Sequence, residues 1–451
     1  MVIAFGEFLI IGKCSPNMAD NSGMPLTPAR RTVLKTIGVA GLAATFQSGT
    51  ATGQADDRER WSFDTDLSIV GSSSPTVVDG TVFIGSTSQE IGNLHAVDAE
   101  TGSEEWRFNT GGAIGSAPTV LDGTVFVGSN DHNLYAVDTD TGNQQWAFDT
   151  GEIIQESSPT VADGSVFVGT GIVDVENYGE LYAVDAETGE EQWVFEADSN
   201  VQSSPTVVDG TVFVGSNDHN LYAIDTETGA EQWRFDTGGP VGSSSPTVAD
   251  GTVFIGGSGT HSDSLIAVDA ETGQRQWGFS TSRGITSSPT VADGTVFVGS
   301  IDDNSLYAVD AETGEEQWSF ETDSWVESSP TVVDGTVFVG GFDNNLYALG
   351  AETGEEQWKF ETASGIHSSP TVVNGTVFIG DSDGIVYAVD ADVSGSSEGS
   401  RVNLKTLGHH GEVTEDSVSS DSIPGFGIGS GLTALGAAGY LLRRRLKSDS
   451  K

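Results

Sequence analysis

A unit of about forty residues recurs eight times between residues 61 and 390 of this 451-residue chain. One copy, from Ser203 to Thr237, reads SSPTVVDGTVFVGSNDHNLYAIDTETGAEQWRFDT. Self-similarity at this period is typical of propellers and solenoids, in which each unit packs only against its neighbours. The tryptophan of the repeat stands at eight positions: Trp61, Trp106, Trp146, Trp193, Trp233, Trp277, Trp318 and Trp358.

The pattern within one unit predicts four short strands, here called A to D. In the copy quoted above they span 204–208, 211–215, 221–225 and 231–235, and they are rich in β-branched and aromatic residues. Asp-Gly between strands A and B predicts a two-residue hairpin, because both residues tolerate positive φ; Asn374-Gly375 fills this place in the last unit. The chain is therefore predicted to be an all-β, eight-bladed propeller of four-stranded antiparallel blades. A solenoid would need atypical capping repeats, which the sequence lacks.

The two ends of the repeat region predict how the ring closes. The last unit stops at Asp390 without a tryptophan strand, and an unpaired strand, Trp61-Ser62-Phe63-Asp64, precedes the first unit. We infer that this N-terminal strand completes the last blade and thereby covers two exposed sheet edges. The eight tryptophans are then expected to pack between blades, each burying roughly 150–250 Å².

Residues 183–195 follow the pattern Ala-Val-Asp-Ala-Glu-Thr-Gly-x-x-x-Trp-x-Phe. This pattern resembles the tryptophan-docking repeat of PQQ-type propellers. The resemblance covers about 330 of 451 residues. It implies the propeller fold. The family includes quinoprotein alcohol dehydrogenases and also non-enzymatic members, such as a lipoprotein subunit of the bacterial outer-membrane assembly machinery. The resemblance therefore leaves the function open, because one fold hosts many functions.

Acidic residues dominate the region 56–423, which holds 63 acidic and 9 basic residues, a difference of −54. Such a charge repels itself at low ionic strength and is tolerated in molar salt, where the screening length falls to roughly 3 Å. In this respect the chain resembles proteins of extreme halophiles. A solvated surface explains the acids, with an acidic binding patch as the alternative. Nucleic acid is not expected as a partner of so negative a surface.

Residues 1–55 are interpreted as an N-terminal extension with an export signal. Arg30-Arg31 precedes an apolar, small-residue stretch from Thr36 to about Phe46, which resembles a Tat signal peptide. The alternative is a chance arginine pair before a buried helix. Cys14 is the single cysteine, so no disulfide within the chain is expected.

The C-terminal region predicts attachment to a membrane. Residues 393–423 are rich in Ser, Gly and Glu and are interpreted as a flexible linker after a propeller of residues 56–392. In 424–451, Pro424-Gly425-Phe426 opens about 17 apolar residues, the short limit for a membrane helix, before three arginines. This end resembles the PGF-type sorting signal of archaeal surface proteins, and the alternative is a plain membrane anchor. Either case predicts an exported, membrane- or lipid-anchored protein on the cell surface.

The faces of the propeller differ in variability. The A–B and C–D turns are short and uniform, whereas the B–C and D–A connections vary in length and share the opposite face, so a ligand is expected there. The residue three places before each repeat proline varies while its neighbours do not, as expected of side chains that point into the channel mouth. These residues are Ser72, Gly115, Glu156, Gln202, Ser243, Thr286, Glu327 and His367.

Six residues near this mouth are candidate ligand-binding residues. Glu156 and Glu327 belong to blades four apart and should face each other across the channel. The alternative is ordinary polar variation in loops. The six candidates are Glu156, Gln202, Arg283, Trp325, Glu327 and His367.

Two classes of function remain. The first is a non-enzymatic surface module that binds or scaffolds envelope proteins or a small ligand, and needs no cofactor. The second, implied only by the resemblance, is a dehydrogenase that uses PQQ and calcium. No catalytic residues and no metal ligands stand out from the repeat, and members of that enzyme family have longer excursions than these nearly minimal blades. The asparagine of Asn374-Gly375-Thr376 matches an N-glycosylation sequence, which a tight turn explains equally well.

Overall fold

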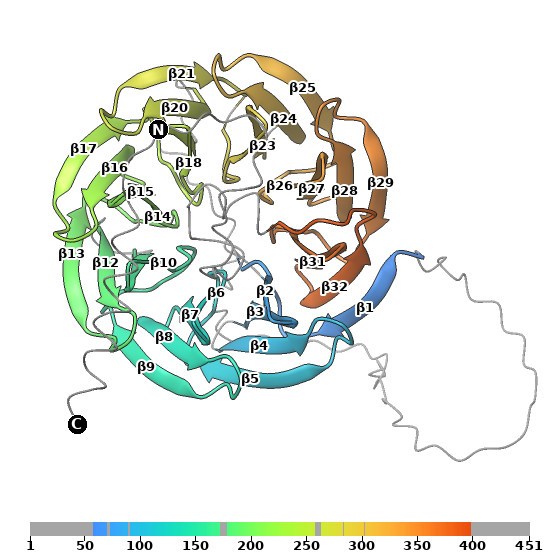
Figure 1. Cartoon of the computed structure of the whole chain (residues 1–451), viewed down its shortest axis with the longest axis horizontal. Coiled ribbons are helices and arrows are strands. Elements are labelled where there is room, and N and C mark those ends of the chain that lie inside the picture. The colour runs from blue at the N-terminus through green and yellow to red at the C-terminus, as the bar shows by residue number, and fades with distance from the viewer. Residues whose placement is uncertain are drawn as a thin grey trace, which may run out of the picture. The chain divides into compact units, whose positions relative to one another are not determined.

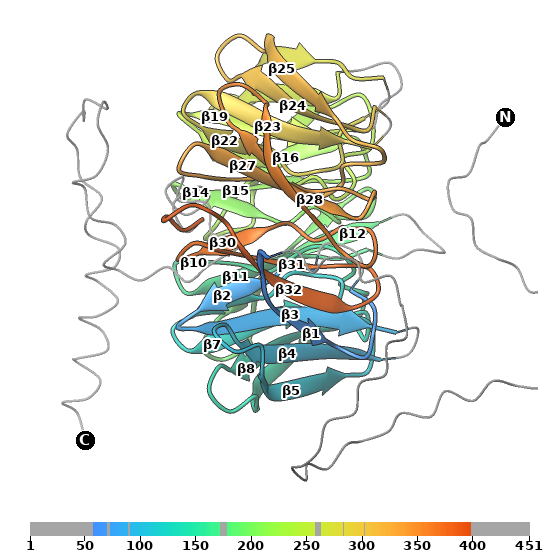
Figure 2. The ribbon, with the colours of Figure 1, turned by 90° about the vertical axis from the view of Figure 1, so that its right-hand side faces the viewer.

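The computed structural model describes residues 57–69, 73–88, 91–171, 178–257, 263–282, 284–301 and 303–397. These residues form 32 strands in eight four-stranded antiparallel sheets, arranged as the blades of a ring (Figure 1, with the side view in Figure 2). The predicted eight-bladed propeller is therefore confirmed. None of the described residues belongs to a helix that could cross a membrane, and the predicted C-terminal helix lies outside the described residues.

Strands A to D of each blade follow one another from the channel to the outer wall. In blades 1 to 4 they are β2 (Thr76–Val78), β3 (Thr81–Thr87), β4 (Gly92–Asp98), β5 (Glu104–Thr110); β6 (Thr119–Leu121), β7 (Thr124–Gly128), β8 (Asn133–Asp138), β9 (Gln144–Asp149); β10 (Thr160–Ala162), β11 (Ser165–Gly169), β12 (Gly179–Asp185), β13 (Glu191–Ala197); and β14 (Thr206–Val208), β15 (Thr211–Gly215), β16 (Asn220–Asp225), β17 (Glu231–Asp236).

In blades 5 to 8 they are β18 (Thr247–Ala249), β19 (Thr252–Gly256), β20 (Leu265–Asp269), β21 (Arg275–Phe279); β22 (Thr290–Ala292), β23 (Thr295–Ser300), β24 (Ser305–Asp310), β25 (Glu316–Glu321); β26 (Thr331–Val333), β27 (Thr336–Gly340), β28 (Asn345–Gly350), β29 (Glu356–Glu361); and β30 (Thr371–Val373), β31 (Thr376–Gly380), β32 (Ile385–Asp390), β1 (Glu59–Asp64).

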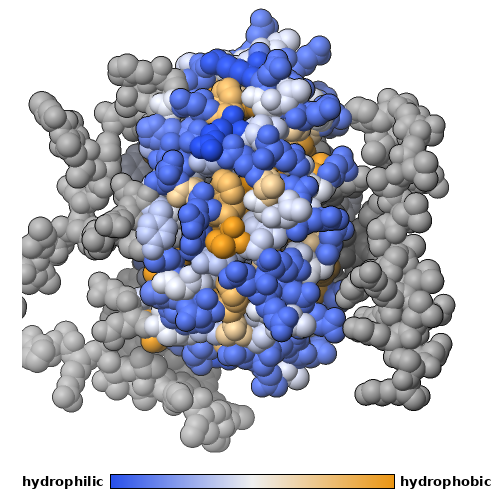
Figure 3. Space-filling view, turned by 90° about the vertical axis from the view of Figure 1, so that its left-hand side faces the viewer, coloured by the Kyte–Doolittle hydropathy of each residue, from blue (hydrophilic) through white to orange (hydrophobic). Residues whose placement is uncertain are grey.

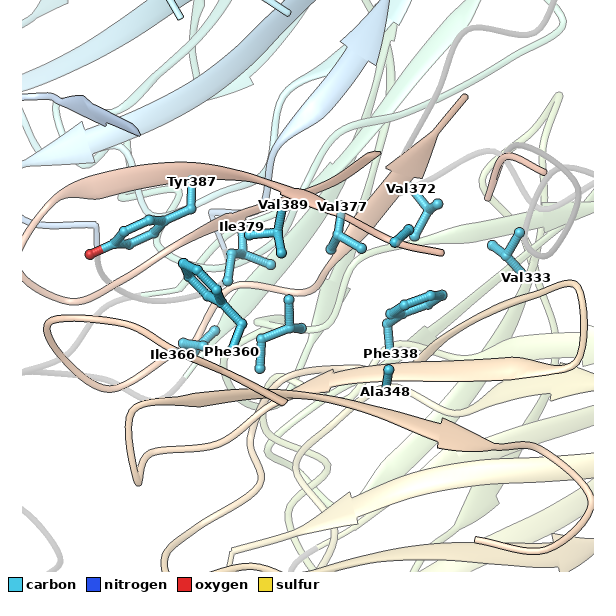
Figure 4. Packing of buried hydrophobic residues seen from close by; sticks show 12 residues of the cluster. Val333, Phe338, Ala348, Phe360, Ile366, Val372, Val377, Ile379, Tyr387 and Val389 are labelled. Carbon is cyan, nitrogen blue, oxygen red and sulfur yellow. The ribbon is translucent and has the colours of Figure 1, made fainter. Parts of the chain in front are cut away.

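The hydrophobic core lies between successive blades. Between blades 7 and 8, Phe338 and Phe360 pack against Ile379 and Val389 (Figure 4). The repeat tryptophans contribute as predicted, because their indoles lie against the C–D turn of the next blade. Trp106, for example, donates its Nε1–H to the carbonyl of Thr139 at 2.8 Å. The outer wall around β13 is mostly hydrophilic, with a narrow apolar band (Figure 3).

The N-terminal strand closes the ring, as predicted. Strand β1 pairs antiparallel with β32, with Trp61 opposite Ala388, and completes blade 8. Blade 8 has no C–D turn, because its strand D is the N-terminal β1. Arg58 lies instead at the place where the C–D turns of the other blades contact the tryptophan of the preceding blade. Its guanidinium lies 4.5 Å from the ring centroid of Trp358 and forms an ion pair with Asp392 at 2.7 Å.

Hydrogen bonds around the channel join neighbouring blades into a continuous ring. In every blade the strand A threonine donates its hydroxyl hydrogen to the carbonyl of the repeat proline in the next blade. These threonines are buried. Each bond therefore ties strand A of one blade to the end of the D–A connection that leads into the next blade. The donors are Thr76, Thr119, Thr160, Thr206, Thr247, Thr290, Thr331 and Thr371.

The tight turns explain why the repeat keeps Asp and Gly at fixed places. At the A–B hairpin of blade 1, Asp79 and Gly80 have φ of 49° and 83°, and Asn374 in blade 8 has φ of 48°, which confirms the predicted positive-φ turns. At the C–D turn, Asp98 Oδ1 accepts hydrogen bonds from the backbone N–H and the hydroxyl of Thr101. These bonds hold the pKa of Asp98 below its usual value.

Blade 7 lacks this side-chain acceptor because Gly350 replaces the aspartate. The turn keeps its backbone closure, since the N–H of Gly354 donates to the carbonyl of Gly350 at 2.8 Å. A Cβ at Gly350 would lie 2.9 Å from Thr353 Oγ1, the partner that an aspartate there would bind. Thr353 must therefore shift slightly before an aspartate at this position could bind its hydroxyl as Asp98 binds Thr101.

We expect Gly350→Asp to stabilise the propeller by about 1 kcal/mol, because it adds two side-chain hydrogen bonds and restricts the unfolded chain. Asp310→Gly, which makes the opposite change in blade 6, serves as the matched control and should destabilise by a similar amount. Chemical denaturation in molar salt measures both free energies of unfolding. A destabilising Gly350→Asp would contradict the expectation.

Residues 393–397, which the sequence assigns to the start of the linker, lie against the propeller. The N–H of Ser397 donates to the carbonyl of Val372 at 2.6 Å, along the channel-side edge of β30. The N–H of Gly395 donates to Asp334 Oδ2 at 2.9 Å. Asp334 belongs to an A–B turn. The last described residues therefore lie at the face that carries the short turns.

Candidate binding site at the channel mouth

The two faces of the propeller carry different connections, as predicted. On the turn face, the C–D turn contacts the A–B turn of the same blade, since the N–H of Ala99 donates to the carbonyl of Gly80. On the loop face, the D–A connection contacts the B–C loop of the next blade, since the N–H of Asn130 donates to the carbonyl of Ala113. The residues of the channel mouth described next lie on the loop face.

A buried serine fixes each variable residue of the channel mouth. Ser157 accepts a hydrogen bond at its Oγ from the N–H of Gly169 in strand B, and Ser328 accepts one from Gly340 in the same way. Both serines are buried. Because successive side chains in an extended segment point in opposite directions, the residue before each serine points away from the blade and toward the channel.

Glu156 lies at this mouth without a hydrogen-bond or ion-pair partner among the described residues. Its burial and the charge of Glu327 raise its pKa to about 7, while His367 acts in the opposite direction. A charge on blade 7 therefore acts on a carboxyl group of blade 3, as expected if the two glutamates face each other across the channel.

Glu327 and His367, on neighbouring blades, form a pair. His367 Nδ1 lies 2.6 Å from Glu327 Oε2. The edge of the His367 ring contacts Phe342, with 4.7 Å between centroids, and Phe342 stacks on Trp325 at 5.8 Å with 23° between the ring planes. These four residues, here called the blade 7–8 cluster, run from the channel mouth outward along the loop face.

The aromatic half of the cluster is open to solvent. The side chains of Trp325 and Phe342 are 51% and 39% exposed. Phe342 lies over Gly365, where a Cβ would come within 2.7 Å of its ring. Among the exposed large hydrophobic residues of the described chain, these two are stacked on each other, so we take them as a candidate contact surface for a ligand.

Phe342 was missed by sequence reasoning, although the repeat contains a signal for it. It stands in the B–C loop where blades 2 and 4 have Asn130 and Asn217. Comparing the loops position by position would have shown this single aromatic beside the variable Trp325. Such a comparison still could not have told that the two rings stack.

Two other candidates do not join the cluster. Gln202 accepts a hydrogen bond at Oε1 from Asn217 Nδ2 at 2.6 Å, so its amide oxygen serves the loop network of blade 4. Arg283, like Ser72, lies outside the described residues. The other described mouth positions are small: Gly115, Ser243 and Thr286.

The raised pKa of Glu156 predicts a pH dependence of stability. The pKa of Glu156 is 4.5 in its ordinary state and about 7 in the folded protein, so the folded state binds this proton more tightly than the unfolded chain does. The stability that this proton confers is fully present below pH 4.5 and is lost as the pH rises to about 7. We expect Glu156→Gln to be more stable than the parent at pH 8 by about 1–3 kcal/mol, and this gain should shrink toward pH 4.5. Denaturation curves at several pH values measure it. Glu187→Gln, an exposed carboxylate on the turn face, should show no such trend.

The site does not form an evident metal centre. No group of three or more His, Cys, Asp or Glu side chains placed to hold a metal ion occurs within the described ranges. What the described part of the mouth offers is an open aromatic pair, one carboxylate bound to a histidine and one carboxyl group without a partner. This arrangement suits recognition of a ligand, and no nucleophile is paired with a base in it.

The family model described as Outer membrane protein assembly factor BamB, of PQQ-type repeats, matches residues 47–177, 155–262 and 261–398. The chain belongs to this family. A second model, the PGF-CTERM motif, matches residues 423–445 and indicates anchoring at an archaeal cell surface through the C-terminus. Neither model covers residues 1–46, which include the predicted twin-arginine export signal. No curated protein shows significant sequence similarity to the chain.

Solved structures with the same fold include BamB, an alcohol dehydrogenase and a designed protein. BamB from Moraxella catarrhalis is 20% identical with a TM-score of 0.58, over 74% of this chain and 99% of that one. Quinohemoprotein alcohol dehydrogenase from Comamonas testosteroni is 18% identical with a TM-score of 0.60, over 74% and 76%. The computationally designed Ika8 protein is 16% identical with a TM-score of 0.62, over 74% and 99%. At these identities the likeness shows the fold alone.

Proposed function

We propose that this protein is a non-enzymatic binding propeller, exported by the Tat route and anchored to the cell surface, which takes its ligand at the loop-face channel mouth. The observation that carries the proposal is the blade 7–8 cluster, where Trp325 and Phe342 expose stacked rings beside Glu327 and His367. The rest of the loop face varies around it, whereas the turn face is uniform.

The path of the chain supports a defined orientation. Both ends of the described propeller lie at the turn face, since Arg58 bonds to Asp392 and Gly395 bonds to Asp334. The surface-anchoring motif follows this end of the chain in sequence. We therefore propose that the turn face is turned toward the membrane and that the loop face, with its cluster, is presented outward to envelope proteins or to a small ligand.

Surface labelling tests the location and orientation. Cys14 precedes the signal, so a single introduced cysteine would be unique in the processed protein. Asp323→Cys lies on the loop face and Glu187→Cys on the turn face, and both positions are exposed. In intact cells we expect a bulky, membrane-impermeant maleimide to label the loop-face cysteine more strongly. Labelling of neither cysteine in cells, with labelling of both in lysate, would contradict surface display.

The described mouth residues do not fit PQQ with calcium. PQQ carries three carboxylates, whereas Glu156 and Glu327 present further negative groups, and His367, the basic side chain found beside them, is already bound to Glu327. The described residues also supply no set of three acidic or histidine ligands for calcium. Soaking the salt-folded protein with PQQ and calcium should leave no bound chromophore and no dye-reducing activity. A bound chromophore with turnover would replace our proposal by the dehydrogenase alternative.

A further inference from the structure

We infer that the channel mouth recognises an alkylammonium group, held between the exposed rings of Trp325 and Phe342 and the carboxylates of Glu327 and Glu156. The inference rests on the proposed function, because it names the class of ligand for the same site. The group can belong to a free amine or to a lysine side chain of a partner, and both present the same chemistry.

The aromatic rings supply the first part of the argument. The eight repeat tryptophans lie between blades, and seven of them donate their Nε1–H to the next blade. Trp325 is the one tryptophan of nine that lies outside the repeat position, and about half of it is exposed. Stacking on Phe342 and the backbone bond from Phe342 N–H to the Trp325 carbonyl hold the pair in place. A cation over such ring faces gains about 0.5–2 kcal/mol.

The carboxylates supply the second part. Glu327 uses Oε2 to bind His367, and its Oε1 has no partner within the described part of the chain. Glu156 has neither a hydrogen bond nor an ion pair there, although it sits where burial and the charge of Glu327 oppose its ionisation. An ammonium group beside Glu327 Oε1 would add a positive charge at the mouth, and this charge would also offset the negative charge that opposes ionisation of Glu156.

The wider charge distribution favours a cationic ligand at low salt, and the local contacts favour it at any salt concentration. The propeller and linker carry 63 acidic and 9 basic residues, so an anionic ligand would meet repulsion on approach. Molar salt screens this field, but the contact of a cation with aromatic faces depends little on long-range charge. A ligand with an apolar body and a positive head therefore fits this mouth better than a bare metal ion.

The test compares tetramethylammonium with the neutral, similarly shaped tert-butanol, using the full-length protein at pH 8 and constant ionic strength. Saturation-transfer NMR on the ligand methyl protons measures binding. We expect tetramethylammonium to bind with saturation and tert-butanol to bind at least tenfold more weakly. Equal binding of the two compounds, or no saturation by tetramethylammonium, would overturn the inference while leaving surface display, which is tested by labelling, untouched.

Substitutions locate the site. Trp325→Ala should weaken tetramethylammonium binding about tenfold, and Trp325→Phe should retain most of it because an aromatic face remains. Glu327→Gln and Glu156→Gln should each weaken binding severalfold, while Glu187→Gln on the turn face should leave it unchanged. Wild-type affinity in Trp325→Ala would place the site elsewhere and refute the assignment.

Two further titrations distinguish the source of the group. Spermidine represents a free amine, and a lysine peptide blocked at both ends represents the side chain of a partner. Tighter binding of spermidine indicates a soluble amine as the ligand, and tighter binding of the peptide indicates a partner protein. Failure of both compounds to compete with tetramethylammonium would contradict a shared site and with it the inference.

Discussion

A chain that begins at Asp66 is expected to lose at least about 5 kcal/mol of stability, the largest effect we predict for any change to the propeller. This truncation removes β1, which pairs with β32 over most of its length and places Trp61 in the interface between blades 8 and 1. It also removes Arg58 and its stacking on Trp358. Strand β32 would then present an unpaired edge at the outer wall. The seam would lose its outermost strand and Trp61, and only the contacts of the inner strands of blade 8 with blade 1 would remain.

The measurement is denaturant unfolding in molar salt, followed by circular dichroism and by size-exclusion chromatography for self-association through the open edge. A chain that begins at Asp57 is the matched control, because it removes the N-terminal extension and keeps every described residue of β1. We expect this control to match the longer parent. Equal stability of the two truncated chains would show that blade 8 does not depend on the borrowed strand.

The fold could be predicted from the sequence because the information is repeated. Eight copies of Asp-Gly or Asn-Gly, with positive φ at each, leave little choice of hairpin, and the missing tryptophan strand after Asp390 has one counterpart, at Trp61. Local turn chemistry and the count of strands thus determine the closed ring. Nothing in these patterns required knowledge of contacts between distant residues.

The site could be predicted only in part, because it depends on where single side chains point. The period of the repeat predicts that Glu156 lies opposite Glu327 and that His367 lies beside Glu327. The structure pairs His367 with Glu327 at 2.6 Å, and the charge of Glu327 acts on the pKa of Glu156. The repeat pattern could not show that the side chain of Gln202 bonds to Asn217 in the B–C loop of the same blade. Such choices depend on hydrogen bonds between neighbouring loops, which differ from blade to blade.

The contacts of residues 393–397 with the propeller could not be predicted from the sequence either, because they depend on hydrogen bonds to neighbouring turns and strands. A composition rich in Ser and Gly indicates a flexible linker, yet Ser397 and Gly395 bond to Val372 and Asp334. Short polar side chains form such contacts wherever a free strand edge and a turn lie within reach. Composition gives the tendency of a segment, and the neighbouring surface decides whether its first residues become ordered.

Dialysis of the folded protein to low ionic strength should abolish its β-sheet circular dichroism, because we propose that the acidic propeller requires salt. Acidic residues outnumber basic ones seven to one in 56–423, so most of them have no cationic partner within the chain. The screening length rises from roughly 3 Å at 1 M salt to roughly 30 Å at 0.01 M, and each carboxylate then interacts with many others. This repulsion favours the expanded state, in which the charges lie farther apart.

Returning the salt should restore the spectrum, unless the unfolded chain has aggregated. Sucrose at matched osmolarity is the control, because it favours compact states through exclusion from the protein surface and does not screen charge. Lowering the pH toward 4.5 at low salt should partly substitute for the added ions, since protonation removes the same negative charges. Full β-sheet structure at low ionic strength and neutral pH would contradict the proposed dependence on salt. Recovery in sucrose equal to that in salt would show that general compaction, rather than charge screening, holds the blades together.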